Sequence, residues 1–415
     1  MAVILTFALA AIILILGFIG NYLFKRTSIP DILLLIAVGF LIGPVFRIIE
    51  PEVLAPISEI FASLALLIIL FDAGLNLNIK KVLRDSPKAA VLTIIGFFVS
   101  VIFITSFTYF IMGWSFMVSL LLGAVLGGIS SSVAIPLISR LKVNEKISTI
   151  ISLESAFTDT LVIVFGLVIL QLITSPFSNG GLYEAGNKIA AAFSIAVVLG
   201  LVSGILWLKV LKYIKKEIYD DIVTLAVVLL MFSVTELLGG NGAIFALTFG
   251  LVLGNGIRIF RVMGIRERIE ASKVMKKFQS QMSFFIRTFF FVFIGLIFSI
   301  NSYVPLYIGI AITAILLVGR YISVFLVTYK DNILASNITT MSVVMGRGLA
   351  AAVLAEIVRS SNVPGAGIFS DIVIVVIISS VIVSTVGISL IGRKIKRCDS
   401  ELNKEKKKKL SSIRS

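Results

Sequence analysis

The sequence has no histidine, a single cysteine and few charged residues. Without histidine, the chain cannot form a Ser-His-Asp triad, a histidine general base or a histidine-ligated metal site. One cysteine, Cys398, cannot form a disulfide within the chain. Only 14% of the 415 residues are charged and 58% are hydrophobic, whereas about 25% are charged in typical soluble domains. These proportions exclude a soluble enzyme, a disordered chain and a nucleic-acid-binding module, and we expect neither a cofactor nor enzymatic activity.

Long apolar stretches dominate the chain instead. A stretch of about 17 to 25 apolar residues can cross a hydrocarbon core of about 30 Å as a helix. The sequence contains thirteen such stretches, which predict an all-α polytopic membrane protein with about 13 transmembrane helices. They lie near residues 2–24, 31–48, 57–78, 88–112, 115–139, 147–173, 187–211, 221–238, 241–256, 281–300, 303–328, 333–358 and 367–391. The first lacks a basic leading region, so we expect a retained helix and not a cleaved signal peptide.

The basic residues predict the orientation of the chain. The net charge is +15, from 37 Lys and Arg against 22 Asp and Glu. Most basic residues gather in alternate connections and in the C-terminal tail, which predicts an external N-terminus and a cytoplasmic C-terminus in the plasma membrane. We expect the basic tail, residues 393–415, to contact anionic lipid headgroups of the bilayer. The basic segment 257–280 is amphipathic and predicts one connecting helix in the membrane interface.

A faint internal repeat relates stretches that lie seven apart in the series. Gly39 in the second stretch aligns with Gly250 in the ninth, and Gly74 in the third aligns with Gly295 in the tenth. A glycine- and serine-rich interruption in the fifth stretch matches residues 346–348 in the twelfth. Because seven is odd, the second copy is inverted in the bilayer. Inverted repeats with matching broken helices indicate a secondary transporter.

The sixth stretch carries a polar track through an otherwise apolar helix. It has the sequence ISLESAFTDTLVIVF, residues 151–165. Residues four apart are neighbours on a helix, so Glu154 and Thr158 form one stripe and Ser155 and Asp159 form the adjacent one. Ionisable groups inside a membrane span are costly and are candidates for function.

The two carboxylates of this track have different predicted roles. We expect Glu154 to be structural, because Arg320 or Arg347 can supply a permanent cation that keeps it ionised. Asp159 is then the carboxylate that is free to hold either a proton or a cation. For Asp72, near the cytoplasmic end of the third stretch, two interpretations stay open. It is a residue at which ions enter the site, or it faces water with no further role.

The fifth and twelfth stretches predict broken helices. In GAVLGGISSSVAIPLISRL, residues 123–141, two glycines, three serines and Pro136 predict an interruption. Freed backbone carbonyls and the hydroxyls of Ser130 and Ser131 are hard oxygen donors that suit an alkali cation. The twelfth stretch has the matching sequence MGRGLAAA. If the breaks meet at mid-membrane, helix ends and the Arg347 guanidinium face a common site.

At these motifs the sequence resembles the monovalent cation/proton antiporter superfamily, specifically the NhaP-type sodium/proton exchangers, over residues 1–392. The most specific match is LESAFTDT at 153–160, which is similar to the family's E-S-x-x-N-D-P box. Supporting matches are PDILLLIAVGFLIGP at 30–44, FDAGLNL at 71–77, TELLGGNGAIFALTFGLVLGN at 235–255 and GRGLAAAVLA at 346–355.

The resemblance implies a homodimer with two domains in each chain. The dimerisation domain would comprise residues 1–82 and 176–302, and the core transport domain residues 83–175 and 303–392, followed by the tail at 393–415. The two broken helices would cross in the core domain. Alternating access would then carry ions across the membrane.

The resemblance also implies roles for particular residues. Cation and proton would compete for Asp159, and Ser155 and Thr158 would be cation ligands. Glu154 would be the structural partner of an arginine, and Arg320 matches the family's position better than Arg347.

Two departures from the family pattern leave the cation open. The family usually has T-D-P where this chain has Ile129, Ser130 and Ser131, and Thr158 replaces an asparagine. The serine run is closer to Kef-type potassium/proton antiporters. From the resemblance to NhaP-type exchangers we predict exchange of Na+ or Li+ for H+. We expect this exchange to be electroneutral because a single carboxylate titrates. The alternatives are a K+/H+ antiporter of the same fold and a cation channel, although the sequence has no filter motif such as T-V-G-Y-G.

Overall fold

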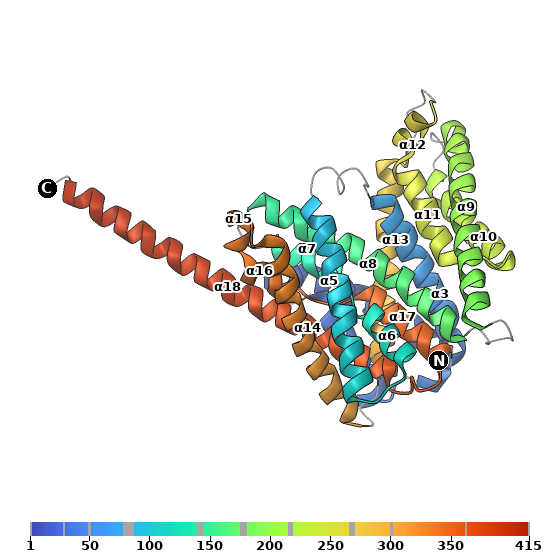
Figure 1. The fold of residues 1–415 in the computed structure, drawn as a ribbon, viewed down its shortest axis with the longest axis horizontal. Helices are drawn as coiled ribbons and strands as arrows, with labels where there is room; N and C mark the ends of the chain where they lie inside the picture. Colours follow the sequence, from blue (N-terminus) through green and yellow to red (C-terminus); the bar gives the residue numbers. More distant parts are fainter. Residues whose placement is uncertain are drawn as a thin grey trace.

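The computed structural model describes residues 2–27, 30–48, 51–77, 87–139, 141, 144–174, 181–214, 219–264, 270–298, 302–361 and 363–413. Within these ranges the regular structure is helical, with no strand, which confirms the predicted fold class. Figure 1 shows the helices packed together, with the C-terminal part of one long helix projecting from them.

The helices of the first half are α1 (Ala2–Thr27), α2 (Asp31–Phe40), η1 (Leu41–Val45), α3 (Pro51–Asn76), α5 (Pro87–Ser106), η2 (Phe107–Ile111), α6 (Phe116–Val125), α7 (Ser131–Ile138), α8 (Glu145–Thr174) and α9 (Gly181–Ile214). Those of the second half are α10 (Asp220–Leu237), α11 (Gly242–Gly254), α12 (Gly256–Val262), α13 (Lys273–Ile297), α14 (Val304–Thr328), α15 (Asn332–Ala335), α16 (Ile338–Val343), α17 (Leu349–Ser360) and α18 (Phe369–Ile413).

Six helices in the described ranges are long and apolar enough to cross a membrane, or seven if the bent pair α11 and α12 is one span. Among the shorter apolar helices, α6 has only ten residues because a break separates it from α7. The number of thirteen spans therefore stays a prediction.

The segment 257–280 does not form the single connecting helix predicted from its amphipathic pattern. The short helix α12 is bent by 81° from α11 and ends at Val262. A turn at Gly264, where φ is +73°, follows it. The hydroxyl of Ser272 then accepts a hydrogen bond from the Met275 N–H at 2.9 Å and begins α13, eight residues before the predicted start. Local turn and capping residues override the amphipathic pattern here.

Only some of the predicted domain boundaries lie within the described residues. Those after residues 82 and 175 lie outside the described residues. The boundary at 392 lies within α18, which continues as a helix to Ile413 (Figure 1). The side chains of residues 394–415 lie outside the described set, so the predicted lipid contact of the tail stays a prediction.

Glycine contacts show the internal symmetry directly. At Gly39 of α2, an added Cβ would collide with backbone atoms of Val292 and Gly295 in α13. At Gly250 of α11, it would collide with the Phe71 backbone of α3, next to Gly74. In the predicted repeat, α2 corresponds to α11 and α3 corresponds to α13. The contact between α2 and α13 therefore corresponds to the contact between α11 and α3. This arrangement confirms the inverted repeat as a feature of the fold.

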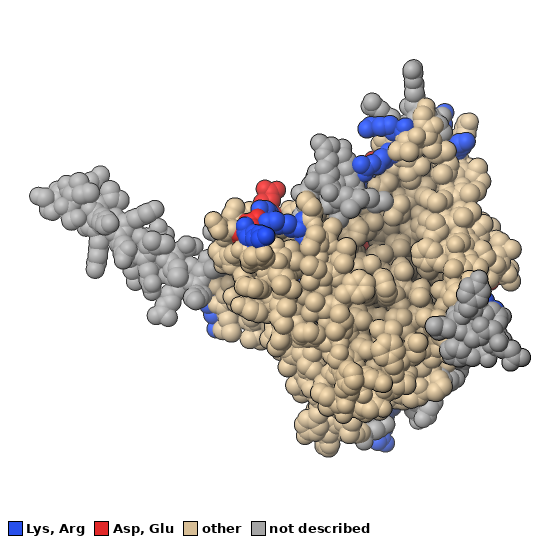
Figure 2. Space-filling view, in the orientation of Figure 1, with Lys and Arg blue, Asp and Glu red and all other residues tan. Residues whose placement is uncertain are grey.

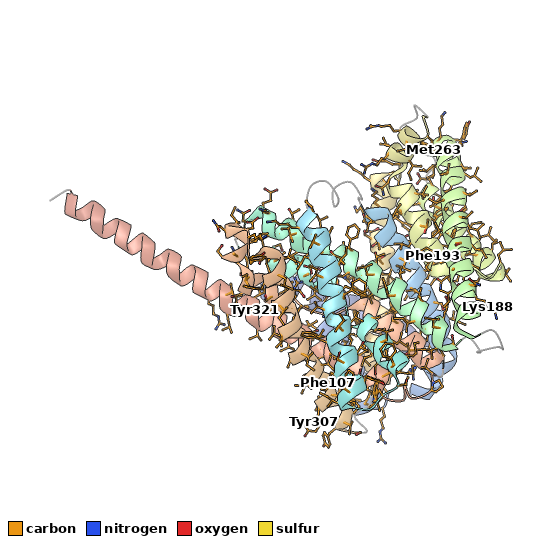
Figure 3. The ribbon with its side chains drawn as sticks, viewed as in Figure 1. Phe107, Lys188, Phe193, Met263, Tyr307 and Tyr321 are labelled. Atoms are coloured by element: carbon orange, nitrogen blue, oxygen red, sulfur yellow. The ribbon has the colours of Figure 1, made fainter. Side chains whose placement is uncertain are left out.

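The outer surface suits a lipid environment. Figure 2 shows that its visible face is mostly uncharged and that most of the visible Lys and Arg side chains gather at the end where α12 and α15 lie. The side chains of Phe193, Tyr307 and Tyr321 are 40%, 69% and 52% exposed, and Figure 3 shows Tyr307 at the lower end of the molecule. Apolar side chains this exposed indicate contact with lipid or with another chain.

One carboxylate at the α14–α15 connection joins three helices at the molecule's basic end. Asp331 Oδ2 lies 2.5 Å from Lys88 Nζ at the start of α5 and 2.6 Å from Lys146 Nζ at the start of α8. Its other oxygen accepts hydrogen bonds from the N–H groups of Ile333 and Leu334 and so begins α15. Hydrogen bonds from Lys146 and Lys88 hold the pKa of Asp331 well below its usual value.

We expect Asp331→Asn to lower the melting temperature in detergent, because it removes the partner of two lysines. A depressed pKa in the folded state gives a stabilisation that is complete above the unfolded value of about 4 and is lost as the pH falls further. The deficit of the variant should therefore be full at neutral pH and shrink below about pH 4. Thermal scans across pH test this. Glu145→Gln, which neutralises an exposed acid in the same region, is the matched control, and an equal deficit there would contradict the assigned role of Asp331.

Candidate cation site

Two interrupted helices cross at the centre of the site. The chain leaves helical conformation between the end of α6 at Val125 and the start of α7 at Ser131, and again between α16 and α17. The Ser130 N–H donates to the Gly346 carbonyl oxygen at 2.9 Å, which joins the two breaks. The first break lies at the glycines and not at Pro136, which sits inside α7. Proline has no N–H, so the carbonyl four residues before Pro136 lacks its usual helical donor. In this short helix that carbonyl lies near the start of α7, and the helix is not interrupted.

Asp159 of α8 faces the start of α7. Its Oδ2 accepts hydrogen bonds from the Ser131 N–H at 3.2 Å and from the Ser131 hydroxyl at 2.9 Å. The free N–H groups and the dipole at a helix N-terminus favour a negative charge. Asp159 has no ion pair within 4 Å in the described part of the chain. The carboxylate is therefore held by neutral donors and remains able to bind a mobile cation.

A cavity of about 250 Å³ opens beside Asp159. It is also lined by Asp72 of α3, Arg287 of α13 and five serines, three at the start of α7 and two from α13. Asp72 Oδ1 accepts a hydrogen bond from Asn76 at 2.9 Å and lies 3.4 Å from the Ser280 hydroxyl. Carboxylate and hydroxyl oxygens are the ligands that alkali and alkaline-earth cations prefer.

The five residues predicted to bind the cation do not all lie on this cavity. Ser130, Ser131 and Asp159 line it, but Ser155 and Thr158 do not. The Thr158 hydroxyl accepts from the Ile129 N–H at 3.0 Å and lies 3.1 Å from the Ile129 carbonyl oxygen, so it satisfies the backbone of the break. The Ser155 hydroxyl lies 3.2 Å from the Ser152 carbonyl oxygen, within its own helix. The cation-ligand roles of Ser155 and Thr158 stay predictions.

The second carboxylate of the track, Glu154, pairs with Arg320 of α14. The Arg320 Nη2 lies 2.8 Å from Glu154 Oε2, and Nη1 contacts Oε1. Glu154 is 1% exposed and Arg320 is 4% exposed. The Arg320 Nε donates to the Met341 carbonyl oxygen at 3.2 Å, next to the second break. Such a two-point pair, buried on all sides, fixes the relative position of α8 and α14.

Arg347, the other candidate partner, lies in the second break. Its N–H donates to the Ser380 hydroxyl at 3.0 Å, and its Nη1 donates to the Met345 carbonyl oxygen at 3.2 Å. Its Nε has no hydrogen-bond partner among the described residues. The structure thus pairs Glu154 with Arg320 and leaves the Arg347 guanidinium as a buried positive charge at the crossing.

The sequence pattern did not lead us to the α13 side of the cavity. Ser280, Ser283 and Arg287 are three and four residues apart, so they share one face of α13. Their spacing is visible in the sequence SQMSFFIR. The predicted connecting helix ends at 280 and the predicted span begins at 281, so the boundary separates Ser280 from Ser283 and Arg287.

The sequence and the fold match known proteins over most of the chain. Residues 9–394 match the family described as "Sodium/hydrogen exchanger, transmembrane". "Na(+)/H(+) antiporter 1" of Methanocaldococcus jannaschii is 26% identical over 68% of this chain and 66% of its own length. "Na(+)/H(+) antiporter ApNhaP" of Aphanothece halophytica is 30% identical over 65% of this chain and 50% of its own length. "K(+)/H(+) antiporter NhaP2" of Shewanella sp. is 25% identical over 56% of this chain and 40% of its own length.

The matched regions thus span between two fifths and about two thirds of these relatives. Among solved structures, the sodium proton antiporter MjNhaP1 from M. jannaschii at pH 8 superimposes with a TM-score of 0.74. Its sequence is 23% identical, and the match covers 95% of this chain and 98% of that one, so it establishes the fold. The broken helices, the apolar helices and the family match together show that this chain is a multi-pass membrane protein of the sodium/hydrogen exchanger family.

Proposed function

We propose that this chain is a secondary antiporter that exchanges Na+ or Li+ for H+, with cation and proton competing for Asp159. One observation carries the proposal. Asp159 lines a cavity at the crossing of two broken helices and is held there by the neutral donors of Ser131. A carboxylate without a permanent cation is stable in a membrane interior only with a proton or an ion bound. The two ligands therefore exclude each other, which couples their movements.

The mechanism we propose is alternating access between two bodies. The core domain contains α5 to α8 and α14 to α18 as far as residue 392, and the dimerisation domain contains α1 to α3 and α9 to α13, within a homodimer. Asp72 lies four residues before the end of α3, and Ser280 lies seven residues after the start of α13. The labelled ribbon of Figure 1 and the charges of Figure 2 place these helix ends near the basic end of the molecule. With the positive-inside orientation in a plasma membrane, the cavity lies nearer the cytoplasm.

The test uses proteoliposomes that contain a trapped pH dye. We expect added Na+ and Li+ to change the internal pH in the presence of a pH gradient, with saturable kinetics. Clamping the voltage with valinomycin and K+ should leave the rate unchanged, because one cation exchanges for one proton. A voltage-dependent rate would contradict the electroneutral mechanism, and ohmic current without a pH change would indicate a channel.

A second candidate, K+/H+ exchange, is favoured by the serines of the first break. Ser130 stands where the family usually has an aspartate, and its hydroxyl lies 2.9 Å from that of Ser132. Dehydrating Na+ costs more free energy than dehydrating the larger K+. A site with one carboxylate fewer compensates that cost less well, which favours K+. A pH response to K+ alone in the same liposomes would favour this candidate over Na+ exchange.

We expect Ser130→Asp to raise the preference for Na+ over K+ by about tenfold, because it adds a charged oxygen beside Asp159. The measurement is the ratio of half-saturating concentrations for the two cations. Ser139→Asp adds a carboxylate at the opposite, exposed end of α7 and should leave the ratio unchanged. If Ser130→Asp still exchanges but the ratio does not move, the missing aspartate does not determine selectivity.

A further inference from the structure

Arg287 is a guanidinium in the wall of a cavity that is otherwise built for cations. It belongs to α13 and lines the same cavity as Asp159 and Asp72. Its Nη2 lies 3.4 Å from Oδ2 of Asp31, which is 4% exposed and lies outside the cavity lining. Its Nε has no hydrogen-bond partner among the described residues, and its Cζ lies 5.6 Å from the Phe284 ring centre. Arg287 is therefore held by Asp31, a residue outside the cavity lining, and its Nε donor is unused among the described residues.

The rest of the cavity offers ligands that a divalent cation accepts as well as a monovalent one. Two carboxylates and five serine hydroxyls are hard oxygen ligands, and Ca2+ takes six to eight such oxygens. A doubly charged ion gains twice the Coulomb energy of a singly charged ion at the same position. Without a further positive charge, divalent cations would compete with the substrate and remain bound.

We propose that Arg287 is the residue that excludes divalent cations from the site. With Arg287, the charges lining the cavity are two negative and one positive, which leaves one negative charge for a single monovalent ion. The repulsion from a fixed charge scales with the charge of the ion, so it discriminates by valence. This inference rests on the proposed cation exchange at Asp159.

The scaling gives a quantitative expectation for Arg287→Gln. Loss of one fixed charge across a cavity of this size should tighten monovalent binding by about tenfold and divalent binding by about the square of that factor, roughly 100-fold. A merely structural role would alter the apparent affinities for Na+ and Ca2+ by similar factors. The ratio of the two changes is thus the diagnostic quantity.

The experiment measures Na+-dependent proton flux in proteoliposomes at increasing Ca2+ concentrations, with Ca2+ binding to the detergent-solubilised protein measured by calorimetry. We expect the wild type to resist Ca2+ and Arg287→Gln to be inhibited, with Ca2+ binding tightened by the larger factor. Arg287→Lys keeps the charge and should remain resistant. Asp72→Asn combined with Arg287→Gln restores the charge count and should regain resistance.

Removing Arg287 alone leaves Asp31 buried without its partner. The double variant Asp31→Asn/Arg287→Gln removes both charges, and it should bind Ca2+ more tightly than the wild type because only Arg287 lines the cavity. If Arg287→Gln and this double variant fold and still reject Ca2+, the inference is overturned. Sodium/proton exchange by the wild type in the same assay would then leave the proposed function standing. Absence of that exchange would instead contradict the proposed function itself.

Discussion

Asp159→Asn is expected to reduce sodium-dependent proton flux to the level of empty liposomes. An amide cannot ionise, so it can neither release a proton to one side nor bind a cation through a charge. Its carbonyl oxygen can still accept the two hydrogen bonds from Ser131, at 3.2 and 2.9 Å in the wild type. The fold should therefore persist, with a stability change of about 1 kcal/mol from the lost charge at the α7 N-terminus.

The measurement is dye-reported flux together with a thermal scan of the same preparation. Asp371→Asn is a matched control, since Asp371 lies in the first turn of α18 and outside the Asp159 cavity. It should exchange at a rate close to that of the wild type. Normal flux through Asp159→Asn would eliminate Asp159 as the shared carboxylate. Loss of flux with a large drop in melting temperature would assign Asp159 a structural role instead.

Glu154→Gln is expected to destabilise the protein by about 3–5 kcal/mol, because it leaves Arg320 as an uncompensated charge in the membrane interior. Both side chains are almost fully buried, and they connect α8 to α14 through two contacts. Arg320→Gln should cost a similar amount by leaving Glu154 unpaired. The double variant Glu154→Gln/Arg320→Gln should recover much of the loss, because two amides can hydrogen-bond to each other without a net charge.

Thermal unfolding of the three variants in detergent forms a double-mutant cycle. A coupling free energy near zero would show that the pair does not hold the helices together. If Glu154→Gln kept its melting temperature but shifted the pH dependence of exchange, Glu154 would be titrating during transport. Exchange would then involve two carboxylates, and the electroneutral mechanism would fail.

Local sequence was sufficient for the all-helical class and for both interruptions, although not for the number of spans or for the segment 257–280. Runs of apolar residues long enough to cross a bilayer form helices because the backbone must satisfy its own hydrogen bonds in lipid. Glycines and serines in the fifth and twelfth stretches predicted both interruptions. Glycine has a low helix propensity, and serine hydroxyls compete for the hydrogen bonds of the backbone. The placement of Glu154 and Asp159 on one face of α8 follows from helical periodicity alone.

Contacts between distant segments could not be deduced in this way. Glu154 could pair with either of two arginines, and Arg320, 166 residues away, is the one that reaches it. Thr158 faces the backbone of Ile129, 29 residues away, and not the cavity. Each outcome depends on how helices far apart in the chain pack, and periodicity within one helix carries no information on that.

The sequence by itself determined that this protein is a polytopic helical membrane protein with an inverted repeat, two broken helices and a carboxylate track in α8. Only the tertiary structure decided which groups share the cavity. Asp72 and Arg287 share this cavity with Asp159 because α3 and α13 pack against each other and both contact α17. The balance of charge around a bound ion is set by these long-range contacts, since Coulomb energies depend on distances in space and not on separations along the chain.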